Sequence, residues 1–172
     1  MSARHGMLVL MRSVLASRNQ ELYSITVRDV ADIADRLGSG HVEALSSSDG
    51  TYQFWVTPSL LGGRRLNAPA TKMLFALTQF SAKQTPILRG DVVITSRTVT
   101  GDPDDLSDHQ MRLLIESLQT IGRRPAFTID RRLRRAARDD QRLRPTDRGG
   151  KQRLHAARAP ATQGRSAATR VS

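Results

Sequence analysis

The chain has 172 residues and a formal net charge of +11, and it contains no cysteine. The lack of cysteine excludes a disulfide framework, a thiol nucleophile and a thiolate metal site. A chain without cysteine fits a cytoplasmic compartment, which is the one we expect. No apolar run approaches the roughly 18 residues that a membrane span requires, so we expect no membrane partner.

The positive charge is confined to one end of the chain. Residues 1–122 carry 12 Lys or Arg against 12 Asp or Glu, whereas residues 123–172 carry 15 against 4. The second part has one aromatic residue, Phe127, and therefore little apolar surface to offset the entropy of ordering. We predict an N-terminal extension (1–20), an α+β globular domain (21–122), and an Arg-rich tail (123–172) that is disordered or partly helical over 130–144. A chain ending at Gly122 is then expected to fold with nearly unchanged stability.

The N-terminal extension contains the apolar run "MLVLMRSVLAS" (7–17). Arg12 interrupts this run too early for the apolar core of a signal peptide. We therefore expect the run to pack on the domain as a helix or strand.

The first half of the domain alternates between two periodicities. Residues 21–27 ("ELYSITV") alternate as a half-buried strand does, and residues 30–37 follow helical spacing, with Asp29 as N-cap and Gly38 after the last turn. Two strand-like flanks in 41–58 surround Asp49-Gly50, a strong hairpin signal. Trp55 is interpreted as part of a second small core, with an exposed contact as the alternative.

The segment "GGRRLNAPATKMLFAL" (62–77) predicts a helix start. Asn67 is the expected N-cap and Pro69 fits the first turn. If Asn67 acts only as a cap, Asn67→Asp should be nearly neutral in stability. Arg64 and Arg65 give a weaker alternative, an anion site beside the helix start. The expected buried positions are Ala70, Met73, Leu74, Leu77 and Phe80.

The last elements of the domain are a strand and a helix. Residues 92–94 form a continuous apolar strand, typical of a central, doubly covered position. Ser107 and Gln110 match a capping box, and Gly122 ends the helix. The predicted buried face of this helix comprises Met111, Leu114, Ile115, Leu118 and Ile121. The resulting order, β-α-β-β-α-β-α, indicates the α+β class, with a small mixed sheet covered by helices.

Catalytic patterns are not recognised. The four histidines (His5, His41, His109 and His155) are far apart, and the acidic residues at 102–108 lack the glycine and terminal glutamate of a calcium loop. We assign no catalytic residue, no cofactor and no metal ligand.

The tail holds the one distinctive pattern, in "DRRLRRAARDDQRLR" (130–144). Five arginines follow i, i+3, i+4, i+7, i+11 and would share one helix face; we call Arg131, Arg134, Arg135, Arg138 and Arg142 the arginine stripe. Such a stripe suits phosphate contacts and predicts DNA or RNA binding. One alternative is an unselected or spacer tail, since arginine, alanine, glycine and proline are abundant in it. The other is contact with a membrane or another acidic partner.

The central segment resembles a small family of uncharacterised domains from actinobacterial plasmids, phages and chromosomal islands. The resemblance runs from about Val27 to Thr100 and rests on "GHVEAL", "QFWV", "RRLNAPAT" and "RGDVVIT". The resemblance implies no settled activity. It implies fold-defining roles for five positions: Asn67, Ala70, Thr71, Gly90 and Asp91.

The leading hypothesis is a non-enzymatic accessory protein of a mobile element, whose domain contacts an unknown protein and whose tail contacts nucleic acid. One alternative is a protein-interaction module with an inert tail. The other is a small enzyme with an unrecognised site.

Overall fold

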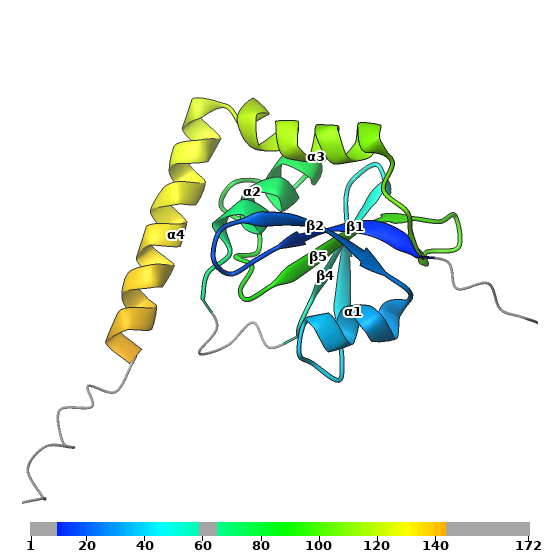
Figure 1. Cartoon of the computed structure of the whole chain (residues 1–172). Coiled ribbons are helices and arrows are strands. Elements are labelled where there is room, and N and C mark those ends of the chain that lie inside the picture. The colour runs from blue at the N-terminus through cyan, green and yellow to red at the C-terminus, as the bar shows by residue number, and fades with distance from the viewer. Residues whose placement is uncertain (1–9, 59–64, 144–172) are drawn as a thin grey trace, which may run out of the picture.

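The computed structural model describes residues 10–58 and 65–143, within which six strands form one sheet (Figure 1). The strand order is β2-β1-β5-β4-β3, and the short β6 also pairs with β5. All of these strand pairs are antiparallel. The sheet was expected to mix parallel and antiparallel pairs, and that part of the prediction is wrong. The strands are β1 (Met11–Ala16), β2 (Leu22–Val27), β3 (Glu43–Ser46), β4 (Tyr52–Val56), β5 (Val92–Arg97) and β6 (Pro103–Asp104).

Helices cover both faces of the sheet, which confirms the α+β class. In Figure 1, α1 lies below the sheet, α2 and α3 lie above it, and α4 stands at one side. The helices are α1 (Val30–Arg36), α2 (Ala68–Leu77), α3 (Asp108–Thr120) and α4 (Arg123–Leu143). No helix within the described ranges is long and apolar enough to cross a membrane.

Strand β1 corrects the predicted N-terminal boundary. It pairs with β2 along its whole length and with β5 over Val14–Ala16, so part of the expected 1–20 extension is an inner strand of the sheet. The apolar run packs on the domain as predicted, in the strand form. Arg12 does not break this strand, because its guanidinium group forms ion pairs with two aspartates. Nη1 lies 2.6 Å from Oδ1 of Asp108, and Nε lies 3.8 Å from Oδ2 of Asp105.

The sheet separates two hydrophobic cores. The larger one joins β1, β4 and β5 to α2 and α3 and includes Phe54, Met73 and Ile94, each fully buried. The smaller one lies under α1 and contains Trp55, whose Nε1–H donates to Thr95 Oγ1 at 3.0 Å. The core interpretation of Trp55 is therefore confirmed, as is the central position of β5.

The predicted caps are confirmed at three helices. Asp29, Asn67 and Ser107 each accept a hydrogen bond from the first turn of α1, α2 and α3, and Gln110 completes the capping box. Two expected core positions are wrong. Phe80 follows the end of α2 and is 42% exposed, and Ile115 is 46% exposed on the outer side of α3.

The predicted start of the helix in the tail is also corrected. Helix α4 begins at Arg123, directly after Gly122, and not near residue 130. Pro125 is compatible with this start because a first-turn proline gives up no hydrogen bond that the helix needs. The predicted disorder of the rest of the tail concerns residues 144–172, which lie outside the described residues.

Candidate nucleic-acid interface

One face of α4 packs on the body of the domain. Ile129 is 1% exposed and Leu133 is 8% exposed where α4 contacts α2. Beside them, Nη1 of Arg132 donates to two backbone carbonyls of the segment after α2, Ala82 O at 2.8 Å and Thr85 O at 2.9 Å. Arg132 therefore stabilises the fold. Its position does not match the spacing of the arginine stripe, and it was not predicted to bind nucleic acid.

Two ion pairs hold the same face of α4. Nζ of Lys72, on α2, lies 2.8 Å from Oδ1 of Asp130, and Nη1 of Arg89 lies 2.5 Å from Oδ2 of Asp140. The carboxylates of α4 that face the body are thus neutralised by cations of the body. The pairs were not predictable from the sequence, because each joins residues more than 50 positions apart.

Most of the arginine stripe occupies the opposite face of α4. Arg134 lies at the edge of that face, where it lines a hollow with Ala68 and its Nε donates to the carbonyl of Asp130 at 3.3 Å. All five residues of the stripe are exposed, and they share one side of the helix, as their spacing predicted.

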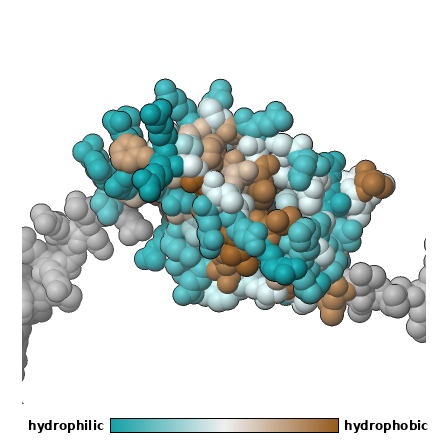
Figure 2. Space-filling model, turned by 90° about the horizontal axis from the view of Figure 1, so that it is seen from above, coloured by the Kyte–Doolittle hydropathy of each residue, from teal (hydrophilic) through white to brown (hydrophobic). Residues whose placement is uncertain are grey.

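Helix α4 contains eight arginines and three aspartates, and two of those aspartates point to the body. The third aspartate, Asp139, is exposed one helical turn from Arg135 and Arg142, so the outer face carries an excess of positive charge with one carboxylate beside it. Figure 2 looks down on α3 and the start of α4, and hydrophilic surface dominates the side where α4 lies.

An exposed aromatic side chain shares this outer face. Phe127 is 63% exposed and lies one helical turn before Arg131. Arg123 and Arg124, in the preceding turn, are exposed as well. This group was not predicted from the sequence; the pattern that indicates it is the spacing i, i+3, i+7 of Arg124, Phe127 and Arg131.

The weaker anion site is only partly described. Arg64 lies outside the described residues, and Arg65 is exposed. The N–H of Ala68 donates to a glutamine side chain at 3.1 Å, that of Ala70 donates to the capping residue, and Pro69 has none. Because the start of α2 is capped by the protein itself, the anion prediction rests on the two guanidinium groups alone.

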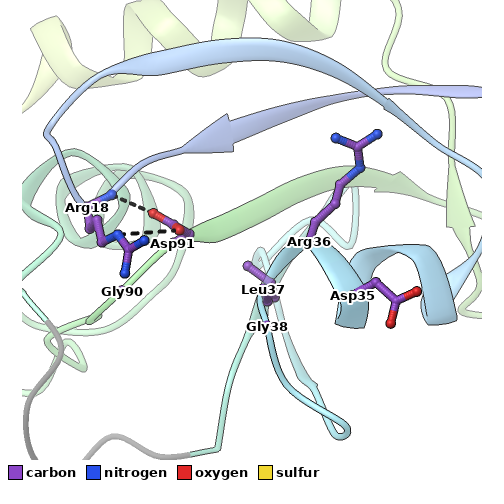
Figure 3. Close-up of a pocket in the computed structure, with 7 residues that line it drawn as sticks. All are labelled: Arg18, Asp35, Arg36, Leu37, Gly38, Gly90 and Asp91. Atoms are coloured by element: carbon purple, nitrogen blue, oxygen red, sulfur yellow. Dashed lines mark hydrogen bonds and ion pairs between the residues drawn. The ribbon is translucent and has the colours of Figure 1, made fainter.

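A hollow of about 280 Å³ lies between the β1–β2 turn, the end of α1 and the start of β5 (Figure 3). Arg18 is held there by the carboxylate of Asp91. Oδ1 of Asp91 accepts from the backbone N–H of Arg18 at 2.8 Å, and Oδ2 lies 3.8 Å from Nε of Arg18. Arg36 donates to the carbonyl of Thr26 at 2.8 Å. Since both guanidinium groups already have partners in the domain, this hollow is a weaker anion site than the face of α4.

The hydroxyl of Tyr52 serves the local structure. Burial raises the pKa of Tyr52, the charge of Asp49 raises it further, and the hydroxyl donates to the carbonyl of Gln110 at 3.0 Å. In the part of the chain that the structure describes, which includes His41 and His109, no group of three or more His, Asp or Glu is placed to hold a metal ion. His5 and His155 lie outside it.

Comparison with models of known families, with curated proteins and with solved structures gives no match to this chain. The resemblance to domains of actinobacterial mobile elements therefore stays a prediction.

Proposed function

We propose that the protein is a non-enzymatic accessory protein that contacts DNA or RNA through the outer face of α4. The observation that carries this proposal is the division of charge on α4. Asp130 and Asp140 are paired with cations of the body, while the arginine stripe is turned to solvent.

The chemistry of the stripe suits a polyanion with regularly spaced phosphates. A guanidinium group presents a planar fork of donors that matches phosphate oxygens. Arg131 and Arg142 are 11 residues apart, so the stripe extends about 16 Å along the helix, enough to follow several phosphates of one strand. Because α4 is anchored to the domain, the arginines are presented from a fixed backbone.

A membrane surface fits this helix less well. A helix that lies in a lipid interface needs a broad apolar face for the acyl chains. The apolar residues Ile129 and Leu133 of α4 are buried against the body. The outer face offers mainly guanidinium groups, which favours a nucleic acid.

We also propose the cell compartment and the genetic setting of the protein. The cell compartment is the cytoplasm, where nucleic acid is accessible. The setting is a mobile element, as the resemblance of residues 27–100 implies, and a protein partner of the α+β domain is left unnamed.

The experiment compares two full-length variants with the same loss of charge. The stripe variant replaces the arginine stripe with Gln. The control variant replaces five exposed cations outside α4 with Gln: Arg18, Arg28, Lys83, Arg97 and Arg112. Affinity for labelled duplex and single-stranded DNA and RNA is measured by fluorescence anisotropy, and circular dichroism checks that each variant is folded.

The stripe variant should bind more weakly than the native chain, by on the order of a hundredfold at about 50 mM salt, because phosphate contacts dominate affinity at low salt. The control variant should lose far less. An equal loss in both variants would mean that only bulk charge matters. Absence of binding by the native chain would refute the proposal and leave the protein-interaction and enzyme alternatives.

A further inference from the structure

Phe127 is the most exposed aromatic residue of the chain. Its 63% exposure compares with 42% for Tyr23 and Phe80, and with 7% or less for Trp55 and Phe54. It lies on the side of α4 away from Ile129 and Leu133, so it adds nothing to the contact with α2. The fold of the described residues therefore gives no reason for a phenyl ring at this position.

The neighbours of Phe127 are phosphate-binding groups. Arg131 and Arg134 follow it by one and two helical turns, and Arg124 precedes it by one. All three are exposed. A flat apolar ring is thus placed within a line of guanidinium groups, which matches how single strands are bound: cations follow the backbone and aromatic rings stack with bases.

This arrangement distinguishes unpaired from paired nucleic acid. The bases of a duplex are already stacked on each other, and inserting a ring between them requires unstacking. An unpaired base has a free face that can lie on the ring without that loss. The stripe alone binds either form, whereas the ring favours a single strand.

We propose that Phe127 stacks with an unpaired base while the arginine stripe holds the neighbouring phosphates, so that the ligand of α4 is single-stranded DNA or RNA. This inference rests on the proposed function, because it concerns the same face of the same helix.

The test uses the full chain, a single-stranded oligonucleotide, and the duplex of the same sequence. Phe127→Leu keeps an apolar side chain and removes the ring. It should weaken single-strand binding roughly 5- to 150-fold, the range for loss of one stacked base, and should leave duplex binding unchanged. Phe127→Trp should restore single-strand affinity, and Phe80→Leu, at an exposed aromatic outside α4, should have no effect.

Phe127→Trp also supplies a direct reporter. Its emission, corrected for that of the buried Trp55, should be quenched on adding the single strand and not on adding the duplex. Phe80→Trp serves as the matched reporter away from α4 and should stay unquenched. The dependence of affinity on salt should be the same for Phe127→Leu and the native chain, because the phosphate contacts are kept.

Four results would overturn this inference. Stacking is refuted if Phe127→Leu binds the single strand as tightly as the native chain does. It is also refuted if the emission of Phe127→Trp stays unchanged while the strand is bound. Both results leave the proposed function standing. Binding of vesicles containing phosphatidylserine with no response to the single strand would identify a lipid surface instead. If the native chain binds neither strand nor duplex, the inference fails together with the proposed function.

Discussion

Asn67 is fully buried where α2 begins, and its side chain makes three hydrogen bonds. Oδ1 accepts from the N–H of Ala70 at 3.1 Å, and Nδ2 donates to the carbonyls of Ala16 and Gly90, each at 2.8 Å. The cap was predictable because it is local in sequence. The two donated bonds were not, since they reach β1 and the start of β5, and they link the helix to the sheet.

These donated bonds change the expectation for Asn67→Asp from nearly neutral to destabilising. An aspartate keeps the cap but cannot donate to Ala16 or Gly90, and it places a carboxylate beside two carbonyl oxygens. The free energy of unfolding should fall by about 2 to 4 kcal/mol, as measured by urea denaturation. The control is Asp29→Asn at the exposed cap of α1, which should change it by less than about 0.5 kcal/mol. An equally small change in both variants would contradict the three-bond role of Asn67.

The β3–β4 hairpin should respond to acid through Asp49. Partial burial tends to raise the pKa of this carboxyl, but hydrogen bonds from Ser47 and from the amide and hydroxyl of Thr51 outweigh burial and lower it. A lowered pKa in the folded state stabilises the fold above the unfolded value near 3.8, and this contribution is lost as pH falls through the folded value.

The measurement is urea denaturation of the native chain and of Asp49→Asn between pH 6 and pH 2.5. The native chain should be the more stable at pH 6, and the difference should shrink once the pH falls below about 4. A difference that stays constant over the whole range would show that ionisation of Asp49 does not contribute.

At the scale of single elements, the sequence predicted most helices and strands because each has its own period. The run that forms β1 was expected to pack on the domain as a helix or strand, but the predicted boundary at residue 21 left it outside, and its place as an inner strand was not predicted. The partners of Arg12, Asp105 and Asp108, lie more than 90 residues away, and a local pattern carries no signal for them. The two-residue strand β6 is too short to have a period at all.

Helix α4 shows the same limit at the other end of the domain. Its scarcity of apolar residues led us to expect no packing of residues 123–143 on the domain, yet Ile129 and Leu133 are enough to bury one face against α2. A chain ending at Gly122 would uncover that part of α2 and remove the bonds of Arg132. We therefore expect such a chain to be less stable than one ending at Leu143.

Leu133→Ala tests whether α4 belongs to the folded unit. Removal of a buried leucine should lower the free energy of unfolding by about 2 to 3 kcal/mol in urea denaturation, through lost burial and the cavity left behind. Arg138→Ala lies on the opposite, exposed face and should change it by less than about 0.5 kcal/mol. If Leu133→Ala were as mild as Arg138→Ala, α4 would be a loosely attached arm.

Over the whole molecule, a neutral body carries a basic helix at one side (Figure 1). The spacing of the arginine stripe predicted that its residues share one face of a helix, because helical geometry alone decides that once a helix forms. The spacing could not tell how the helix is attached or that Phe127 shares the exposed face. Those features depend on which side the body occupies, and that is a property of the tertiary fold.

The dependence of affinity on salt is the sharpest test of whether the arginine stripe holds phosphates. Each neutralised phosphate adds about −0.9 to the slope of log affinity against log salt on a duplex, and about −0.7 on a single strand. The slope of the native chain should therefore be steeper than that of the stripe variant by about 4.5 on a duplex or about 3.5 on a single strand. Equal slopes for the two proteins would show that these arginines do not touch phosphate and would contradict the account.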